Sequence, residues 1–370
     1  MATAEDHEHM ARALRLARRG LYNTDPNPRV GCVLVRDGRI VGEGFTWPAG
    51  GPHAERVALA AAGEAARGAT AYVSLEPCCH TGRTGPCSRA LVEAGVARVV
   101  CAARDPNPRV DGGGIRELEA AGIEVECGVL EAAAEALNRG FFARMRRGRP
   151  WVRSKLAASL DGRTALANGK SQWITSAAAR ADVHRWRARS SAVLTGSGTV
   201  LADDPRLTAR LEDEPDAEVL QPLRVIVDSQ LATPANARLF REPGEVVIFT
   251  TRDGGGDAAR LAAAGARIER VRGGDRCDLG DVLARLAALE VNEVWVEAGP
   301  ALNGALLAAG LVDELVLYFA PLVLGDRARG MFALDELTAL DEAVRLEIDD
   351  VRRVGTDWRI IARPLPRVTG

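Results

Sequence analysis

The chain has 370 residues, of which 47% are hydrophobic and 26% charged, which is typical of a folded globular protein and argues against disorder. Its 48 basic and 50 acidic residues nearly cancel, so no overall positive field favours nucleic acid as a partner, although a local basic patch stays open. No apolar run approaches the ~18 residues that span a bilayer, and seven cysteines are too few for a disulfide scaffold, so we expect a cytoplasmic, reducing location.

The first half of the chain alternates between helix and strand signals. Apolar residues at helical spacing predict a helix over residues 7–19, and two β-rich runs around Asp37-Gly38 predict a hairpin of residues 29–35 and 39–45. The next elements are expected to be helix 53–67, strand 71–75, helix 86–94, strand 97–103, helix 114–121, strand 123–127 and helix 131–145. This order predicts an α/β sandwich with a central sheet.

A second α/β series follows a basic segment, residues 144–150, which we interpret as the linker between two domains, 1–147 and 148–370. Strands are expected at 152–158, 192–194, 224–227, 246–250, 267–271, 293–297 and 314–319, and helices at 177–189, 258–264, 279–289 and 301–309. The acidic stretch 202–220 is expected to be a loop.

Three residues of the first half, His53, Cys78 and Cys87, suit a zinc ion. One imidazole and two thiolates form a borderline-soft ligand set, and the thiolates balance the charge of Zn²⁺. Three protein ligands leave a fourth position open, where water becomes acidic enough to supply hydroxide near neutral pH. We therefore expect a catalytic zinc site, with a structural site closed by Cys79 or His80 as the alternative.

Glu55 is expected to shuttle a proton rather than bind the metal. Residues two apart do not face each other on a helix flank, so His53 and Glu55 serve one site only if it lies beyond the helix N-terminus. H-x-E followed by P-C is the signature of zinc nucleobase deaminases. Their second cysteine usually occupies the position that Thr81 holds here, and the next candidate, Cys87, follows a longer loop.

Longer motifs occur in order along nearly the whole chain. They are Asn27-Pro28, Val30-Gly31, His53-Ala54-Glu55, Glu76-Pro77-Cys78-Cys79-His80, Gly82-Arg83-Thr84, Pro86-Cys87, Asp105-Pro106-Asn107-Pro108, Lys155-Leu156-Ala157-Ala158-Ser159-Leu160-Asp161-Gly162, Ser171-Gln172-Trp173-Ile174-Thr175, Asp203-Asp204-Pro205 and Leu207-Thr208. Together they resemble the RibD family of bifunctional riboflavin biosynthesis proteins. The resemblance implies a cytidine-deaminase-like three-layer domain followed by a dihydrofolate-reductase-like α/β domain.

The same resemblance implies two successive reactions. The first half deaminates 2,5-diamino-6-(5-phosphoribosylamino)pyrimidin-4(3H)-one with Zn²⁺, and the second reduces the ribosyl group of the product to ribityl with NADPH. The implied partners are therefore small phosphoribosyl pyrimidines, without nucleic acid or membrane, in a homo-oligomer. In the first half, Asn27, Arg83, Asp105 and Asn107 fall on family positions that hold the pyrimidine and its phosphate, although Asn27 also suits a turn and Arg83 a solvated loop.

In the second half the sequence lacks the G-x-G-x-x-G fingerprint of dinucleotide-binding folds. The loop 195–199 and the segment Glu297-Ala298-Gly299-Pro300 each follow a predicted strand and suit phosphate binding. By resemblance, the cofactor positions are Ala157, Trp173, Thr199, Asp203 and Ser229, to which we add Gly299. The substrate positions are Ser171, Arg187, Leu207, Arg210 and Glu297.

Lys155 is one of only two lysines in an arginine-rich chain, and we expect it to polarise or protonate the opened sugar carbonyl. The chain departs from common family residues at Thr46, Arg83 and Ala298. Three alternatives stay open at this point: a zinc-stabilised nucleic-acid module, a deaminase that edits tRNA or DNA, and a chain with only one active half.

Overall fold

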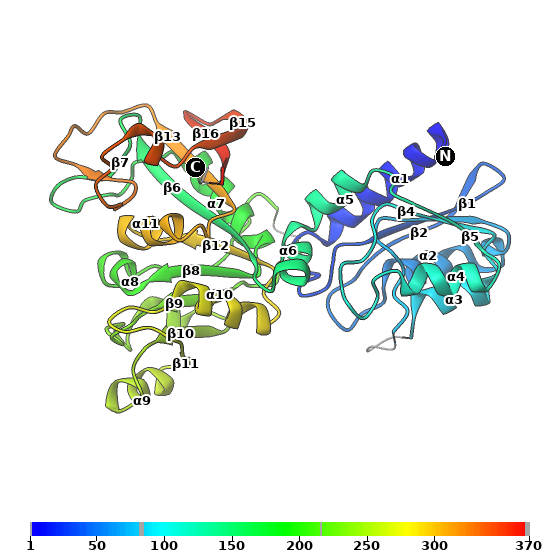
Figure 1. Ribbon diagram of the computed structural model, residues 1–370, viewed down its shortest axis with the longest axis horizontal. Helices are drawn as coiled ribbons and strands as arrows, with labels where there is room; N and C mark the ends of the chain where they lie inside the picture. The colour runs from blue at the N-terminus through cyan, green and yellow to red at the C-terminus, as the bar shows by residue number, and fades with distance from the viewer. Residues whose placement is uncertain (1, 81–84, 215–216, 367–370) are drawn as a thin grey trace. The chain divides into compact units, whose positions relative to one another are not determined.

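The structure is a computed structural model that describes residues 2–80, 85–214 and 217–366 (Figure 1). The chain divides into two compact units, Met1–Arg149 and Pro150–Gly370, which we call the first and the second unit. Both contain helices and sheets, as the alternating pattern predicts. None of the helices in these described ranges is long and apolar enough to cross a membrane.

A five-stranded sheet with the strand order β2-β1-β3-β4-β5 forms the centre of the first unit. The strands are β1 (Gly31–Arg36), β2 (Arg39–Phe45), β3 (Thr70–Val73), β4 (Arg98–Cys101) and β5 (Glu124–Cys127). β1 pairs antiparallel with β2 and β3, whereas β3, β4 and β5 run parallel. The carboxyl ends of β3 and β4 therefore meet at one edge of the sheet. The segment that contains Cys78 follows β3, and the segment that contains Asp105 follows β4.

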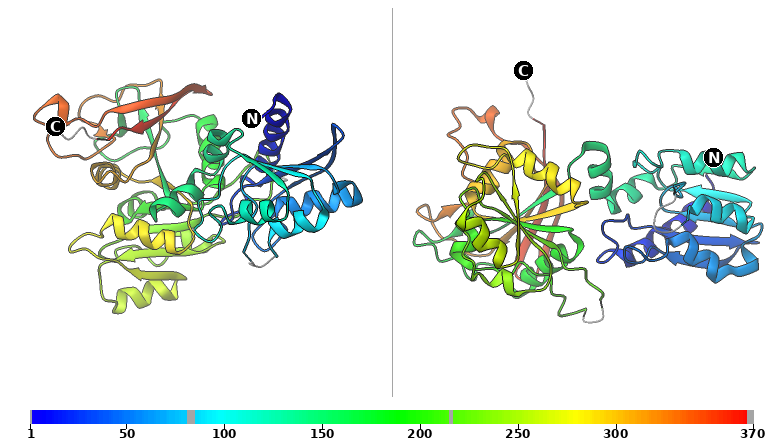
Figure 2. Two further views of the ribbon diagram at one scale, coloured as in Figure 1. Left: turned by 45° about the vertical axis from the view of Figure 1, so that its right-hand side comes forward. Right: turned by 90° about the horizontal axis from the view of Figure 1, so that it is seen from below.

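Helices cover both faces of this sheet. They are α1 (Ala4–Ala17), α2 (Ala54–Ala62), α3 (Cys87–Ala94), α4 (Gly113–Ala120), α5 (Glu131–Leu137) and α6 (Arg139–Arg147), with short 3₁₀ turns at Arg18–Gly20 and Gly63–Ala66. α1 packs on Gly31, where an added Cβ would lie 2.0 Å from the Ala13 carbonyl oxygen, and α2 packs on Gly44, where it would lie 2.4 Å from that of Ala54. Gly44 pairs with Cys32, the neighbour of Gly31, so α1 and α2 lie on opposite faces (Figures 1 and 2).

The prediction of one long helix over residues 131–145 is wrong, because the chain forms α5 and α6 with a break at Asn138. The side chain of Asn138 is buried, accepts a hydrogen bond from the Arg29 backbone N–H (2.8 Å) and donates one to the Arg29 carbonyl (3.0 Å). This side chain therefore pairs with the backbone before β1, and the helix is interrupted at the residue that makes the contact. α6 continues to Arg147, so most of the predicted linker is helical.

The second unit contains a nine-stranded sheet in the order β11-β10-β9-β8-β12-β6-β13-β16-β15. The bounds are β6 (Trp151–Ser159), β8 (Ala192–Gly196), β9 (Leu223–Val227), β10 (Val246–Thr250), β11 (Ala266–Arg270), β12 (Glu293–Glu297), β13 (Glu314–Ala320), β15 (Leu346–Val354) and β16 (Asp357–Pro364). The strands from β11 to β13 in this order are parallel, and β16 and β15 are antiparallel. A separate pair joins β7 (Arg163–Ala165) and β14 (Arg329–Gly330).

The helices of the second unit lie on both faces of the parallel strands (Figure 2). They are α7 (Ala177–Arg189), α8 (Ser197–Asp203), α9 (Gly256–Ala263), α10 (Leu279–Ala288) and α11 (Pro300–Ala308), with 3₁₀ turns at Arg238–Arg241 and Leu340–Glu342. In β13, Leu315 and Leu317 join the core with α10 and α11, and Val316 and Tyr318 join the core with α7. β13 thus has apolar residues on both faces, as covered parallel strands do.

Two expectations for the second unit are wrong. The loop expected at 195–199 is the end of β8 and the start of α8, and α8 continues to Asp203, inside the stretch expected to be loop. The hairpin of β15 and β16 was not predicted. Most of β15 is exposed, and its alternation of apolar and polar residues extends only from Leu346 to Asp349, before the register shift between Ile348 and Asp350.

Candidate active sites

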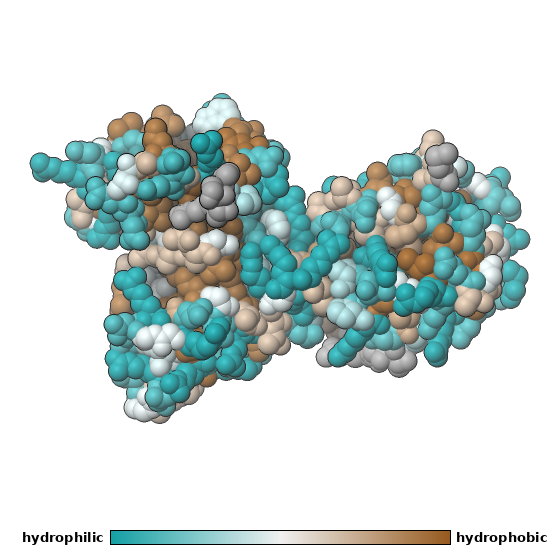
Figure 3. Space-filling model, in the orientation of Figure 1, coloured by the Kyte–Doolittle hydropathy of each residue, from teal (hydrophilic) through white to brown (hydrophobic). Residues whose placement is uncertain are grey.

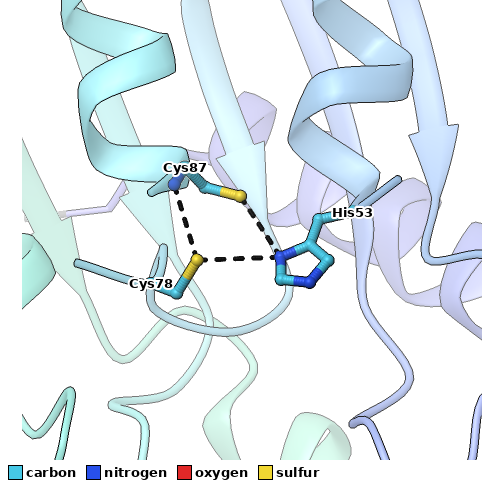
Figure 4. A group of neighbouring side chains, drawn as sticks. All are labelled: His53, Cys78 and Cys87. Atoms are coloured by element: carbon cyan, nitrogen blue, oxygen red, sulfur yellow. Dashed lines mark hydrogen bonds between the residues drawn. The ribbon is translucent and has the colours of Figure 1, made fainter. Parts of the chain in front are cut away.

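Three side chains of the first unit converge on one point (Figure 4). The Nδ1 atom of His53 lies 3.6 Å from the Sγ atom of Cys78 and 3.4 Å from that of Cys87. His53 is the N-cap residue of α2, Cys78 lies in the loop after β3, and Cys87 is the first residue of α3. Two helix N-termini and a strand end thus supply the ligand atoms.

This donor set fits a zinc ion. Tetrahedral geometry with Zn–N of about 2.0 Å and Zn–S of about 2.3 Å places the nitrogen and sulfur atoms about 3.5 Å apart. The observed nitrogen–sulfur separations of 3.6 Å and 3.4 Å match this value. Three residues that would hold the metal are therefore already at ligand spacing, and no other group of three or more His, Cys, Asp or Glu residues at such spacing occurs among the described residues.

The electrostatics of the site favour a thiolate. A hydrogen bond with the Cys87 thiol, followed by one with His53, lowers the pKa of Cys78 to about 4 against the opposing effect of burial. The Cys87 backbone N–H also donates to the Cys78 sulfur, at 3.4 Å. The hydrogen bond with Cys78 raises the pKa of His53. Metal ligation requires the thiolate form, so the environment of Cys78 supports its role as a ligand.

Glu55 lies in the first turn of α2, beside the ligand cluster, and its side chain is only 4% exposed. Burial, followed by the negative charge of Cys78, raises the pKa of Glu55 to about 7. A bound cation would act in the opposite direction. Because α2 begins directly after His53, the site lies at the helix end, where the spacing of His53 and Glu55 requires it to be.

The predicted substrate residues of the first unit lie in two loops. Asn27 is half-buried in the segment before β1, and its backbone N–H donates to the Thr24 carbonyl (2.9 Å), as in a turn. Asp105 is buried after β4, and its Oδ1 atom accepts the Asn107 backbone N–H at 2.8 Å. Burial, with the charges of Glu76 and Cys78, raises the pKa of Asp105 to about 7. Arg83 lies outside the described residues.

Thr46, one of the departures from common family residues, is only 3% exposed. Its backbone N–H donates to the Val30 carbonyl at 2.9 Å. Thr46 therefore lies at the end of β2, beside the strand that follows the Asn27 segment.

In the second unit, Lys155, Arg187 and Glu297 form a charged cluster. Glu297 pairs with Lys155 in the register of β12 and β6 and accepts two hydrogen bonds from the Arg187 guanidinium, at 2.5 Å and 2.8 Å. Burial raises the pKa of Glu297, but Arg187 and Lys155 outweigh it and lower the value to about 2. Burial lowers the pKa of Lys155, and Glu297 opposes this effect. An ionised carboxylate at the carboxyl end of β12 thus bonds a cation on α7, Arg187, and lies beside a second one on β6, Lys155.

Arg210 joins this cluster through Thr208. The Thr208 carbonyl accepts a hydrogen bond from Arg187 (3.0 Å), and its hydroxyl oxygen accepts one from Arg210 (2.6 Å). The neighbouring residue Leu207 is buried and has a φ of 57°, in the left-handed region. The structure therefore brings Arg187, Glu297 and Arg210 together around residues 207–208.

The predicted cofactor positions are spread around the carboxyl edge of the parallel strands. Thr199 and Asp203 lie on α8, and Gly299 is the exposed N-cap residue of α11. Ser229 follows β9, and its hydroxyl oxygen accepts the Cys277 backbone N–H at 2.9 Å. Ala157 is half-buried on β6. This edge is where ligands bind in α/β sheets.

Ser171 and Trp173 lie between β7 and α7, away from these strand ends in sequence. Trp173 is 70% exposed, and the Arg180 guanidinium lies 4.5 Å from the centre of its ring. Ala298, the third departure, is half-buried, and its carbonyl accepts a hydrogen bond from Asn303 at 2.7 Å.

Two residues at these sites were missed in the sequence. His184 lies one turn before Arg187 on α7, and its Nδ1 accepts the Arg210 backbone N–H at 3.2 Å. Burial, with the charges of Arg187 and Arg210, lowers the pKa of His184 to about 4, so it is neutral at pH 7. The i, i+3 spacing from Arg187 is a signal that could have identified it. The other residue, Glu76, is part of a quoted motif but was given no role.

The matches to known family models lie on either side of the boundary between the two units. Residues 3–103 match the cytidine and deoxycytidylate deaminase zinc-binding region, and residues 150–360 match the RibD C-terminal domain. The chain is 50% identical to the riboflavin biosynthesis protein RibD of Escherichia coli over 361 residues, covering 95% of this chain and 98% of that protein. It is 47% identical to the protein of the same name from Haemophilus influenzae, covering 98% of each.

Solved structures give the same result. Acinetobacter baumannii RibD matches with a TM-score of 0.92 and 45% identity, covering 98% of this chain and 99% of that one. A Thermotoga maritima protein described as a diaminohydroxyphosphoribosylaminopyrimidine deaminase/5-amino-6-(5-phosphoribosylamino)uracil reductase matches with a TM-score of 0.86 and 34% identity, covering 98% and 99%.

Proposed function

The chain belongs to the RibD family, and from that premise we propose how its residues carry out the two reactions of this family. It is a bifunctional enzyme of riboflavin biosynthesis, a zinc-dependent deaminase and an NADPH-dependent reductase. The first reaction converts 2,5-diamino-6-(5-phosphoribosylamino)pyrimidin-4(3H)-one to the 5-aminouracil. The second reduces the ribosyl group of that product to ribityl.

We assign deamination to residues 1–147 and reduction to residues 148–370. The division of the chain after Arg149 supports this assignment, as do the separate matches to a deaminase and a reductase family. The zinc cluster lies entirely in the first unit, and the cluster of Lys155, Arg187 and Glu297 lies entirely in the second. Each unit therefore contains charged groups for its own reaction.

The convergence of His53, Cys78 and Cys87 beside Glu55 is the observation that carries the deaminase proposal. When bound, zinc makes water acidic enough to supply hydroxide near neutral pH. The Glu55 carboxylate accepts a proton from the attacking water and delivers it to the departing amine nitrogen. Its buried position in the first turn of α2, beside the ligand cluster, supports both transfers, because a general acid–base must lie within hydrogen-bond reach of the atoms that exchange the proton.

The phosphoribosylamino pyrimidine is assigned to the loops around the zinc ligands. Asn27 and Asp105 offer amide and carboxyl groups to the edge of the base, and Asn107 and Arg83 hold the substrate and its phosphate. The buried position of Asp105 supports this role, because a carboxyl with a pKa of about 7 both donates and accepts hydrogen bonds near neutral pH.

In the reductase, the protein mainly positions two carbon atoms and excludes water, because NADPH supplies the hydride. We assign the sugar phosphate to Arg187 and Arg210, and the ribose hydroxyls to Glu297, with Ser171 and Leu207 completing the substrate site. Lys155 donates a proton or hydrogen bond to the opened sugar carbonyl. NADPH is assigned to the carboxyl edge of the sheet and to the segment before α7, through Ala157, Trp173, Thr199, Asp203, Ser229 and Gly299.

We also propose, from the same family resemblance, that the protein forms a homo-oligomer. β15 forms one edge of the large sheet and exposes Leu346 (40%), Ile348 (59%) and Val351 (51%). Figure 3 shows brown, hydrophobic atoms in the region where Figure 1 places β15 and β16. An exposed apolar edge strand is suited to pairing with a second copy, and sedimentation of the purified chain measures its mass.

The deciding experiment compares both activities before and after metal removal. The purified protein should contain one zinc per chain, release ammonia from the diaminopyrimidine and oxidise NADPH with the deaminated product. Chelation should abolish ammonia release, leave NADPH oxidation unchanged and be reversed by added zinc. A folded, metal-free preparation that still releases ammonia, or one that loses both activities together, would contradict the assignment.

A further inference from the structure

Glu76 is a buried carboxylate that the roles assigned above leave unused. It lies two residues before the zinc ligand Cys78, and it is 3% exposed. Its two oxygens accept four backbone hydrogen bonds from one segment of the chain, residues 105–115. The donors are the N–H groups of Asp105 (3.1 Å), Gly112 (3.0 Å), Gly114 (3.0 Å) and Ile115 (3.2 Å).

These donors lie at the two ends of the Asp105 loop. Asp105 begins it, directly after β4, and the other three lie at the N-terminus of α4. The N-cap residue of α4 is Gly112, which has no side chain to cap the helix. Glu76 replaces that cap, because Gly114 and Ile115 are the second and third residues of α4 and their N–H groups have no partner within the helix. A carboxylate is also favoured by the positive end of the helix dipole.

The fit between the two segments leaves no room for adjustment. An added Cβ at Gly114 would lie 1.9 Å from the Pro77 carbonyl oxygen, and at Gly113 it would lie 2.6 Å from the Cys79 sulfur. The start of α4 is therefore in direct contact with the segment that carries the zinc ligand Cys78. The Glu76 backbone N–H adds a bond to the Ala103 carbonyl, at 2.9 Å.

A chain of hydrogen bonds continues from Glu76 into the loop. Glu76 accepts the Asp105 backbone N–H, and the Asp105 side chain accepts the Asn107 backbone N–H at 2.8 Å. The Asn107 carbonyl in turn accepts the N–H groups of Val110 (2.8 Å) and Asp111 (3.0 Å). The backbone positions of both substrate residues thus depend on the carboxylate that precedes the metal ligand.

We propose that Glu76 is a positioning residue of the deaminase, which fixes the loop of Asp105 and Asn107 relative to Cys78 and thereby sets the affinity for the phosphoribosylamino pyrimidine. This inference rests on the function proposed above. Glu76 touches neither the substrate nor the metal in this role. It aligns the part of the site that holds the base with the part that performs the reaction.

Glu76→Gln tests the inference with little change in side-chain volume. The new amide NH₂ group faces backbone N–H groups, so one end of the Asp105 loop loses its acceptor. We expect KM for deamination to rise roughly tenfold to a hundredfold, because buried N–H groups without an acceptor drive a local rearrangement. We expect kcat to change by less than about threefold and the zinc content to stay at that of the wild type, because His53, Cys78, Cys87 and Glu55 keep their contacts.

The matched control is Glu119→Gln, which removes the same charge from an exposed position on α4. NADPH oxidation with the deaminated product, measured on the same preparations, reports the second unit. Calorimetric titration of the zinc-loaded proteins with the deaminated product follows binding at both units, so a change that occurs in Glu76→Gln and not in Glu119→Gln reports the affinity of the first unit. A double-mutant cycle with Asn107→Ala then asks whether both residues act through the same loop.

The proposal predicts that the effect of Glu76→Gln on KM falls below about threefold once Asn107 is alanine. Independent, multiplying effects would overturn it. So would a loss of zinc with unchanged KM after reloading, or a first unit that fails to fold beside a working reductase, because Glu76 would then serve the metal or the fold. If wild-type protein releases no ammonia, the proposed function fails, whereas an active wild type with an unaffected Glu76→Gln refutes only the inference.

Discussion

Replacing Glu297 by glutamine removes the carboxylate that bonds Arg187 and raises the pKa of Lys155. Glu297 accepts two hydrogen bonds from Arg187 and one from the Trp295 indole N–H (2.9 Å), and it supports the charge of Lys155. Its side chain is 14% exposed. The variant therefore leaves the half-buried Arg187 without its paired carboxylate and Lys155 with Asp203 as its remaining anion, so the stability of the second unit and its reaction rate should both fall.

The pKa of Glu297 gives the size of the expected loss in folding stability. Folding lowers the pKa of Glu297 from 4.5 to about 2, which corresponds to about 3 kcal/mol of folding stability at neutral pH. The folded-state value is the lower one, so this contribution is present above pH 4.5 and is lost as the pH falls towards 2. At pH 3 the difference between wild type and variant should be less than half of that at pH 7.

Urea unfolding followed by tryptophan fluorescence measures this difference. Trp47 is the only one of the six tryptophans before residue 150, so the signal reports mainly the second unit. Trp295 adds a direct probe, because its indole bonds to Glu297 and stacks on Trp186 at 5.4 Å. The control is Glu245→Gln, at an exposed position. A loss below about 1 kcal/mol at pH 7, or a loss that is the same at pH 3, would refute the reasoning.

Three further predictions concern the first unit. Glu55→Gln should keep its zinc and its NADPH oxidation but lose roughly 10²- to 10⁴-fold in kcat for ammonia release, and a loss below tenfold would remove Glu55 from the proton transfer. Gly44→Ala should weaken zinc binding in a chelator competition, because its Cβ would lie 2.4 Å from the Ala54 carbonyl oxygen and must displace α2 together with His53. The control Gly256→Ala has open space around the new Cβ and should leave zinc binding unchanged. Asp6→Asn should destabilise the first unit by about 3 kcal/mol at pH 7, because Arg98 holds the pKa of this buried carboxyl well below its usual range. That contribution is present above about pH 4 and is lost in more acidic solution. The loss of stability should appear as zinc release at a lower temperature on heating, and equal zinc release in both proteins would contradict the prediction.

Local patterns predicted most elements of the fold. The helix predicted over 177–189 and the strands predicted over 39–45, 246–250 and 293–297 agree with α7, β2, β10 and β12 to the residue. Each has buried apolar residues at a regular period or a strong turn beside it. The failure over 131–145 occurs where a distant contact decides the conformation. The break at Asn138 depends on Arg29, and no window of sequence around Asn138 contains that partner.

The candidate zinc site could be predicted because its chemistry is carried by residue types that are rarely interchangeable. An imidazole, two thiols and a carboxylate at these spacings identify the donor set before any fold is known. The reductase site differs, because positioning a sugar and a nicotinamide requires no particular nucleophile. The resemblance to a family indicated Arg187 and Glu297 separately, and their pairing at 2.5 Å required the structure.

Glu76 shows why the supporting contacts of a site are harder to predict than its ligands. A glutamate before Pro77 has the same sequence appearance whether it is solvated or buried, and its four partners are backbone N–H groups, which every residue except proline possesses. Only the packing of α4 against Pro77, which Gly114 permits, brings those groups to the carboxylate. The identity of a metal ligand is a property of its side chain, whereas the role of a positioning residue is a property of the fold around it. Sequence motifs therefore locate the reaction, and the structure is needed to find what aligns the substrate with it.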